Sequence, residues 1–185
     1  MQHFLKTTIP FAATIILSAC GNNNNPENKA EAAHNHDHAA MEQPQMATTT
    51  HPVLKNDKLN AVYQHYVHLT TALTNGDVAE AKIAANAIEA GSKSIDGASG
   101  IVSSAEKIMT APDIAAQRIS FSGMSKDMAE LIKKEGLSGG ELYVAFCPMA
   151  LNDKGATWIS GSKAIRNPYF GEKMLTCGEV KETIQ

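Results

Sequence analysis

Hydrophobic residues recur at spacings of three and four through residues 57–135, a period typical of α-helices with one buried face. The first helix is predicted from Asp57 to Asn75, because the glycine that follows breaks the pattern. Its apolar face consists of Leu59, Val62, Tyr63, Tyr66, Leu69 and Leu73. His65 and His68 lie on the other side. Their spacing of three would let them share a metal ion, but we expect both to be solvated.

A second helix is predicted through the alanine-rich residues 78–90. The four residues Asp-Val-Ala-Glu at positions 77–80 have the pattern of a capping box, which is typical of a helix start. Ile83 and Ile88 are the larger apolar residues of this segment, and we expect both to contact the core.

Two more helices are predicted before residue 136. A short one covers residues 101–109, and Pro112 is well placed at the start of the next, with Asp113 in its first turn. The apolar face of this last helix consists of Ile114, Phe121, Met124, Met128, Leu131 and Ile132. Its two methionines could be mistaken for a copper-binding pair, but their positions favour packing in the core.

The last fifty residues have a different pattern. Residues 142–146 (Leu-Tyr-Val-Ala-Phe) predict a short strand, and the remainder is rich in Gly, Asn and Pro, as loops are. The predicted fold class is therefore mainly α. A small antiparallel bundle of about four helices is followed by a C-terminal lobe of irregular strand and loop, and the whole body spans residues 57–181.

The N-terminal residues 1–19 predict a signal peptide, because their apolar run is too short to span a bilayer. The run ends in Leu-Ser-Ala followed by Cys20, which matches the bacterial lipobox. This resemblance implies cleavage before Cys20 and a lipid on its sulfur, so the mature chain would be anchored to a membrane. The alternative is an ordinary cleaved signal with an incidental cysteine.

Residues 20–56 predict a disordered tether after the lipidated cysteine, because they contain few branched apolar residues and several prolines. The tether contains His34, His36, His38 and His51. A flexible histidine tract can bind Cu(II), Zn(II) or Ni(II) without preformed geometry, so we expect a secondary metal site here. The alternative is a low-complexity spacer in which histidine is simply one more polar residue.

Composition excludes some classes of function. The chain has 185 residues, a net charge of −3 and 5% aromatic residues. Nucleic-acid binding normally needs a basic patch or stacking aromatic side chains, so no nucleic-acid partner is expected. The body also lacks a Cys-x-x-Cys pair and a nucleophile motif beside its histidines. We therefore expect neither an enzyme nor an organic cofactor.

The remaining cysteines, Cys147 and Cys177, each have a methionine nearby. Residues two apart point the same way in a strand, so Met149 can face the same point as Cys147. Residues three apart share a face of a helical turn, so Met174 can do the same for Cys177.

These two arms can converge only if the turn at residues 167–171 brings the second arm back toward the strand. Two thiolates and two thioethers would then form a soft site that selects Cu(I) or Ag(I). Trp158 could cap a monovalent cation with its ring face.

A disulfide between Cys147 and Cys177 is the alternative. Two cysteines in an oxidising compartment usually pair, and a bridge closing about 30 residues would contribute roughly 3.6 kcal/mol in the chain-entropy model. The two interpretations exclude each other at any instant, because a disulfide sulfur is not a thiolate ligand.

Four C-terminal segments and part of the fourth predicted helix resemble one family closely. The segments are 146–150 (Phe-Cys-Pro-Met-Ala), 154–160 (Lys-Gly-Ala-Thr-Trp-Ile-Ser), 165–171 (Ile-Arg-Asn-Pro-Tyr-Phe-Gly) and 174–180 (Met-Leu-Thr-Cys-Gly-Glu-Val). In the helix, Asp113, Gln117-Arg118 and Phe121 look similar too. The family is a domain-of-unknown-function family of bacterial envelope proteins, found as lipoproteins and fused to copper/silver efflux adaptor subunits of the Cus type. The Cys-Pro-Met segment is also similar to a short heavy-metal-binding domain of the same efflux systems.

The resemblance covers roughly residues 57–181 and implies a link to copper or heavy-metal handling, without supplying a ligand set. We therefore expect a lipoprotein of the cell envelope of a Gram-negative bacterium, facing the periplasm. It would bind copper or a similar soft ion in metal homeostasis or efflux, with an efflux adaptor as a candidate partner. The alternative is a structural or interaction module that carries the Cys147–Cys177 disulfide and docks on such an adaptor.

Overall fold

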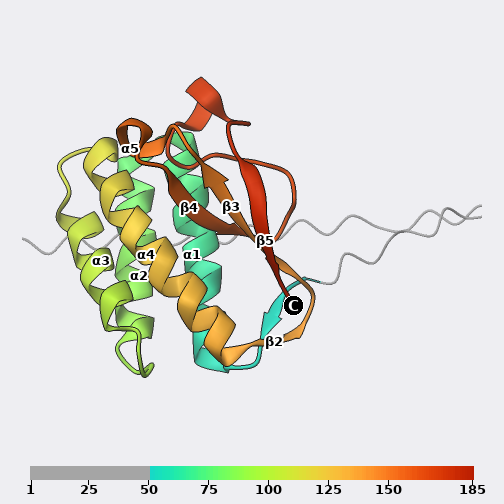
Figure 1. The fold of residues 1–185 in the computed structure, drawn as a ribbon. Helices are drawn as coiled ribbons and strands as arrows, with labels where there is room; N and C mark the ends of the chain where they lie inside the picture. Colours follow the sequence, from blue (N-terminus) through green and yellow to red (C-terminus); the bar gives the residue numbers. More distant parts are fainter. Residues whose placement is uncertain (1–50) are drawn as a thin grey trace, which may run out of the picture. The chain divides into compact units, whose positions relative to one another are not determined.

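The computed structural model describes residues 51–185, and four main helices form most of this part. They are α1 (Asp57–Asn75), α2 (Val78–Ser92), α3 (Ser99–Thr110) and α4 (Ile114–Glu135). Each helix packs against the next one along the chain, as Figure 1 shows. The prediction of a mainly helical fold with a small bundle of about four helices is confirmed.

The first helix begins and ends at the residues that its sequence indicates. The Asn56 side chain accepts hydrogen bonds from the amides of Lys58 and Leu59 and caps the N-terminus. Gly76 has φ 74°, a left-handed conformation that glycine adopts without cost, and it ends the helix. All six residues of the predicted apolar face are buried.

The orientation of α2 corrects one prediction. Ile88 is fully buried, but Ile83 is 58% exposed. Residues five apart on a helix point about 140° away from each other, so these two isoleucines cannot both face one core. Small alanines form most of the buried stripe instead, and a Cβ placed on Gly91 would lie 2.8 Å from Val62 of α1. The helices α1 and α2 therefore lie close together at this point.

The predicted helix starts lie close to the observed ones but differ in detail. Asp77 caps α2, whereas the Glu80 carboxylate bonds His68 at 3.1 Å instead of completing a capping box. Asp113 is itself the cap of α4 and accepts a hydrogen bond from Ala116 at 2.8 Å. Pro112 thus precedes the helix rather than starting it.

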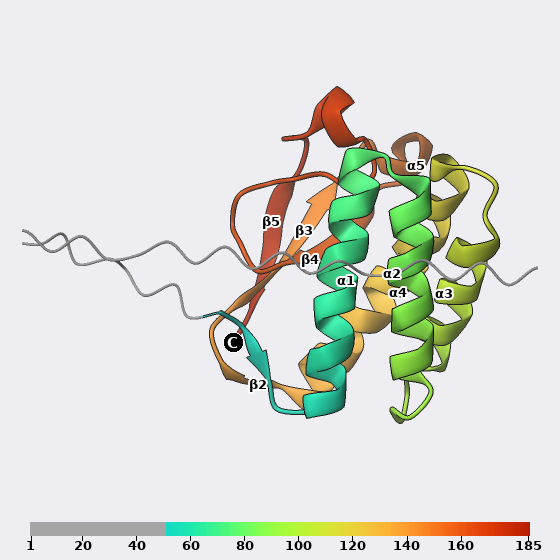
Figure 2. The same ribbon diagram turned by 180° about the vertical axis from the view of Figure 1, so that it is seen from behind.

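The C-terminal lobe is more regular than its sequence predicts. It contains an antiparallel sheet of β3 (Leu142–Cys147), β4 (Ala156–Ser160) and β5 (Glu179–Ile184), in the order β4-β3-β5. The strand β4 packs against α4, and the sheet lies beside α1 and α4 at one side of the bundle (Figures 1 and 2). The strand β5 reaches residue 184, so the body extends beyond the predicted end at 181.

A second, two-stranded sheet fixes where the body begins. It pairs β1 (Val53–Leu54) with β2 (Leu137–Gly139). Leu54 is buried, and the amide of Lys55 donates to the carbonyl of Gly136. A buried leucine and paired backbone thus place residues 53–56 in the body. The predicted tether, which extends to residue 56, is therefore too long.

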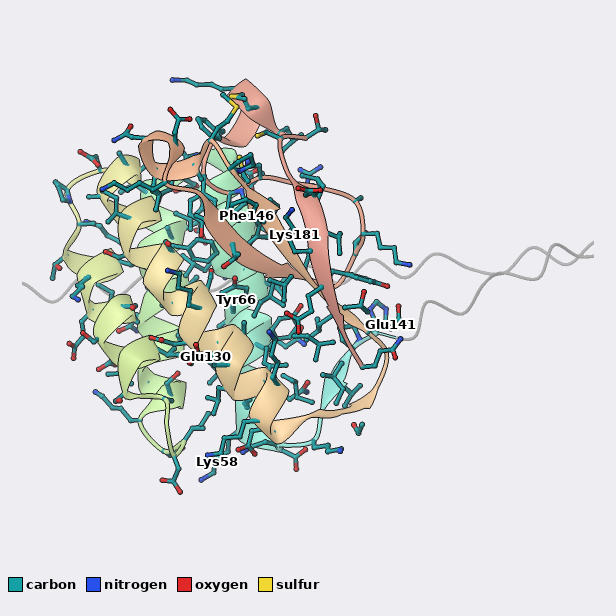
Figure 3. All side chains as sticks on the ribbon, in the orientation of Figure 1. Lys58, Tyr66, Glu130, Glu141, Phe146 and Lys181 are labelled. Carbon is teal, nitrogen blue, oxygen red and sulfur yellow. The ribbon has the colours of Figure 1, made fainter. Side chains whose placement is uncertain are left out.

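Tyr66 joins the bundle to the lobe. Its hydroxyl lies 2.8 Å from the Ser125 hydroxyl of α4 and accepts a hydrogen bond from the Ile159 amide of β4. Its ring stacks on Phe121 at 5.4 Å, and burial raises its pKa to about 12. Figure 3 shows Tyr66 between the helices and the sheet. The two halves of the body therefore share one core.

The predicted signal peptide, Cys20, His34, His36 and His38 lie outside the described residues. None of the helices within residues 51–185 is both long enough and apolar enough to span a bilayer.

Candidate functional site

The two C-terminal cysteines lie side by side. Cys147 is the last residue of β3 and is fully buried, whereas Cys177 lies between η1 (Gly171–Met174) and β5 and is half-buried. Their sulfur atoms are 2.8 Å apart, and both are free thiols. This separation is longer than a disulfide bond of about 2.05 Å and shorter than an ordinary contact between two unbonded sulfur atoms. The predicted approach of the two arms is therefore present.

A buried asparagine makes the turn that brings the second arm back. Asn167 donates from its Nδ2 to the carbonyl of Cys177 at 2.7 Å. Its Oδ1 accepts from the amides of Tyr169 and Phe170 at 2.8 and 3.3 Å, and its own amide donates to the carbonyl of Leu175. One side chain thus closes the turn at both ends.

Met174 and Cys177 occupy a single turn. The amide of Cys177 donates to the carbonyl of Met174 at 3.1 Å, directly after the 3-10 turn η1. This backbone hydrogen bond keeps Met174 close to Cys177 along the chain. That the two side chains share a face stays a prediction.

Met149 is placed differently from the prediction. The strand stops at Cys147, and Met149 has a right-handed helical conformation with φ −82° and ψ −9°. The alternation of a strand therefore does not apply to it, and its side chain is 46% exposed while Cys147 is buried. Pro148 explains the difference, because proline has no amide hydrogen to continue the ladder.

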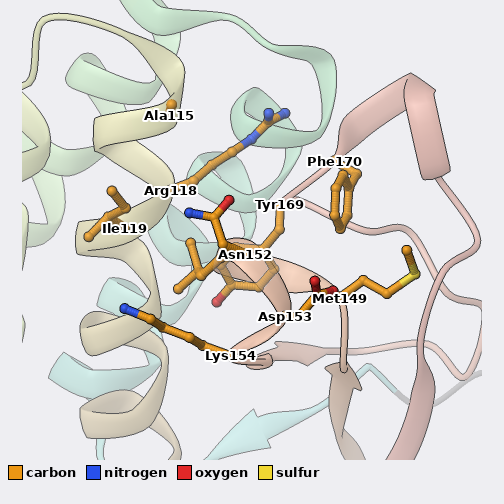
Figure 4. Close-up of a pocket in the computed structure, with 10 residues that line it drawn as sticks. Ala115, Arg118, Ile119, Met149, Asn152, Asp153, Lys154, Tyr169 and Phe170 are labelled. Carbon is orange, nitrogen blue, oxygen red and sulfur yellow. The ribbon is translucent and has the colours of Figure 1, made fainter.

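The Met149 side chain lies at a cavity of about 550 Å³ beside α4 (Figure 4). Ile119, 63% exposed, lines the cavity from α4, and Phe170 lines it from the Asn167 turn. Charged residues at the cavity are Arg118, Asp153 and Lys154. The cavity is thus built from both the helical bundle and the lobe.

An unusual turn follows Met149. In α5 (Ala150–Asp153), the residues Leu151, Asn152 and Asp153 have φ values of 54°, 59° and 62°. A left-handed conformation costs an ordinary L-residue roughly 1–2 kcal/mol, although Asn and Asp tolerate it better. Leu151 offsets its cost by packing on the core. Asn152 and Asp153 are residue types compatible with such a turn, whereas Leu151 carries no sequence signal of it.

The Trp158 side chain is buried and held in place by its packing, so it does not form an exposed cover over the cysteine pair. It is only 1% exposed and packs edge to face on Tyr169, with ring centroids 6.1 Å apart. In the β3–β4 register, Cys147 lies opposite Ala156 and Ala145 lies opposite Trp158, so these side chains share one face of the sheet.

Arg118 connects the bundle to the Asn167 turn. Its Nε donates to the carbonyl of Pro168 at 2.7 Å, and its Nη2 donates to the carbonyl of Leu73 near the end of α1 at 2.8 Å. Partial burial lowers the pKa of the guanidinium. The neighbouring Gln117 donates from α4 to the carbonyl of Val78 in α2. Both residues therefore hold backbone segments of different elements together.

The proximity of the two thiols affects their ionisation. The hydrogen bond with Cys147 raises the pKa of the Cys177 thiol, and desolvation raises it further. Metal binding requires thiolates, so a metal ion at this pair must displace protons, and its apparent affinity falls as the pH falls.

Harder ligands do not gather in the described part of the chain. Within residues 51–185, no three side chains of His, Cys, Asp or Glu come together in a way that could hold a metal ion. His65, His68 and His51 are exposed. A metal site at the cysteine pair would therefore depend on sulfur ligands.

Residues 62–140 match the family model of a protein of unknown function (DUF3347). The match covers most of the helical bundle and ends before β3, so both thiols lie beyond it. It is consistent with the expected resemblance to a domain-of-unknown-function family. No curated protein and no solved structure matches the chain.

Proposed function

We propose that this protein is a membrane-anchored envelope lipoprotein that binds Cu(I), or a similar soft ion such as Ag(I), in metal homeostasis or efflux. The observation that carries the proposal is the contact of Cys147 with Cys177 at 2.8 Å, held by the Asn167 turn. Thiolate and thioether sulfur select Cu(I) over harder ions. Because no cluster of harder ligands competes within residues 51–185, sulfur chemistry is the chemistry of this site.

Under this proposal Cys147 and Cys177 are the primary ligands. An ion held between two thiolates separates the sulfurs by up to twice a metal–sulfur bond, roughly 4.6 Å for bonds near 2.3 Å. The half-buried Cys177 side chain would rotate to open that distance. Met174, whose carbonyl accepts from the Cys177 amide, would supply a third ligand, and the exposed Met149 would have to turn away from its cavity to supply a fourth.

The remaining elements of the proposal concern location and partners. The lipobox ending at Cys20 supports a lipid anchor in a membrane that faces the periplasm. His34, His36, His38 and His51 would form a weaker, adaptable secondary metal site in the tether. An efflux adaptor is the partner that the sequence resemblance suggests.

Anaerobic titration of the reduced protein with Cu(I), against a chromophoric Cu(I) chelator, tests the metal site. We expect one Cu(I) per chain at the cysteine pair. Cys147→Ser and Cys177→Ser should each weaken binding by at least 100-fold, and Met174→Leu should weaken it by roughly tenfold. Met124→Leu is the matched control, because Met124 is buried in the core and contributes no ligand.

Two outcomes of this titration contradict the proposal. One is unchanged Cu(I) affinity in both cysteine variants. The other is unchanged affinity in Met149→Leu and in Met174→Leu together, which would remove the thioethers from the site and leave a bare cysteine pair.

The second candidate function is a structural or interaction module with a Cys147–Cys177 disulfide. The contact between the two sulfurs favours it equally, because sulfurs this close bond after a small side-chain rotation. It predicts that the cysteine variants lose roughly 2–5 kcal/mol of stability under oxidising conditions. It also predicts that both methionine variants behave as the unmodified protein does.

A further inference from the structure

The two thiols of the candidate site differ in access. The Cys147 side chain is fully buried, whereas Cys177 is partly exposed on the loop before β5. A reagent in solution therefore meets Cys177 first. When the two sulfurs form a disulfide, a thiolate that attacks the Cys177 sulfur releases the Cys147 sulfur, which stays buried inside the fold.

The backbone on both sides of the pair is fixed without using the sulfurs. Phe146 and Cys147 are paired in the ladder with Glu179 and Ala156. The carbonyl of Cys177 accepts from the Asn167 side chain, and its amide donates to Met174. Hence the sulfurs can change their bonding by side-chain rotation alone.

The residue after Cys177 adds to this restraint. Gly178 has φ +136°, and a Cβ at this position would lie 2.9 Å from both the Phe146 carbonyl oxygen and Cη2 of Trp158. The backbone beside Cys177 is therefore packed directly on β3 and β4. An ordinary side chain at position 178 would push Cys177 away from Cys147.

We propose that Cys147 and Cys177 form a redox gate, in which the dithiol binds the soft ion, the disulfide excludes it, and a dithiol oxidoreductase resets the pair through Cys177. This inference rests on the proposed function and adds its regulation and a partner class. Only the dithiol supplies two thiolates, and a thiol–disulfide exchange needs one accessible sulfur. The arrangement of one exposed and one buried sulfur, in contact, meets both requirements.

Closing the gate passes two electrons and two protons from the dithiol to an oxidising disulfide, such as oxidised glutathione, by two thiol–disulfide exchanges. The resetting reaction also proceeds in two exchanges. A thiolate of the partner attacks the Cys177 sulfur, the Cys147–Cys177 bond breaks, and Cys147 leaves as a thiolate that takes up a proton. The second partner thiol then attacks the mixed disulfide and releases Cys177, which is protonated in turn. The partner dithiol loses two electrons and two protons and becomes a disulfide, and the cysteine pair gains both.

The experiment uses the mature lipidated chain in detergent, in which Cys20 has no free thiol under the proposed function. One sample is reduced, and the other is oxidised with oxidised glutathione and then freed of reagent. Both are titrated anaerobically with Cu(I) against the chelator. The oxidised sample is also mixed with a thioredoxin variant that keeps only its attacking cysteine, and the trapped peptide is located by mass spectrometry.

We expect the reduced chain to bind one Cu(I) and the oxidised chain to bind at least 100-fold more weakly. The trapped thioredoxin should be bonded to Cys177. A Cys147→Ser chain that is kept reduced, and therefore carries no disulfide of any kind, is the control and should give no exchange product with the reduced trap.

The outcomes separate the two proposals. If the reduced chain does not bind Cu(I), the proposed function fails, and the gate fails with it. If reduced and oxidised chains bind equally, the gate fails while metal binding stands. If the trap bonds Cys147, or forms no adduct with the oxidised chain, the assignment of Cys177 as the point of entry is wrong.

Discussion

Replacing Asn167 with Ala removes the side chain that closes the turn behind Cys177. Three hydrogen bonds are lost: Nδ2 to the Cys177 carbonyl at 2.7 Å, and Oδ1 from the amides of Tyr169 and Phe170 at 2.8 and 3.3 Å. Asn167 itself is fully buried. Each buried backbone group left without a partner costs about 1–3 kcal/mol, and the long third bond contributes least. We expect a loss of about 3–4 kcal/mol in the free energy of unfolding.

Urea unfolding of the reduced, metal-free protein at neutral pH measures this loss. Asn86→Ala is the matched control, because Asn86 is exposed on α2, and its replacement should change stability by less than about 0.5 kcal/mol. A loss below about 1 kcal/mol in Asn167→Ala would refute the reasoning, since it would mean that water or a shifted backbone satisfies the exposed partners.

The free energy of unfolding of an Asn167→Asp variant should depend on pH. This variant keeps the acceptor for Tyr169, but an ionised carboxylate cannot donate to the Cys177 carbonyl, and burial raises the pKa of an unpaired carboxyl. The protonated acid can donate this bond. The stability of the variant relative to the unmodified protein should therefore be highest below about pH 4 and decrease as the pH rises through the raised folded-state pKa. A stability difference that stays constant from pH 4 to 8 would contradict this account.

Four further results are expected. Arg118→Met should lower the free energy of unfolding by about 2–4 kcal/mol, because two backbone carbonyls lose a charged donor. Arg118→Lys should recover part of that loss, and equal losses in the two variants would contradict the role of Arg118 as donor to both carbonyls. In α2, urea unfolding should show a loss of about 2–4 kcal/mol for Ile88→Ala and less than about 0.5 kcal/mol for Ile83→Ser. Cys20→Ala should move the protein from membranes to the soluble envelope fraction, and its retention on membranes would argue against the anchor. A peptide of residues 31–51 should bind Cu(II) with an affinity that rises as the pH passes about 6.5. Equal binding by a peptide with all its histidines replaced by alanine would show that the tract is only a spacer.

The helices could be predicted because large apolar side chains mark their buried faces. The six residues from Leu59 to Leu73 fall at helical spacings, and all are buried. The orientation of α2 does not follow in this way, because alanines dominate and more than one stripe is compatible with the pattern. Size alone favours Ile83 in the core, and its exposure shows that size does not determine the orientation of an alanine-rich helix.

The strands of the lobe were harder to predict, because pairing with neighbouring strands and packing determine where they form. The edge strand β5 has only two apolar residues, Val180 and Ile184, in its six positions, does not alternate regularly, and depends on β3 for its hydrogen bonds. The left-handed turn at Leu151 has no sequence signal, since packing on the core holds it in place. At the site, the sequence indicates a turn at residues 167–171 and makes the approach of the two cysteines conditional on it. The position of Met149 does not follow from the sequence, because Pro148 ends the strand before it.

The anchors of the lobe are independent of the state of the sulfurs. Asn167 holds the carbonyl of Cys177, and Arg118 holds the carbonyl of Pro168, so neither interaction changes when a thiol is oxidised or binds a metal ion. The chain between the cysteines spans 30 positions, and a cross-link closing a loop of about that length contributes roughly 3.6 kcal/mol. A metal ion that binds only the folded state stabilises it too, in proportion to the logarithm of its concentration over its Kd. The oxidised and metal-loaded chains should therefore both be more stable than the reduced, metal-free chain, which relies on these two anchors alone. The cysteine pair can therefore change between its thiol, disulfide and metal-bound states while the fold around it stays the same.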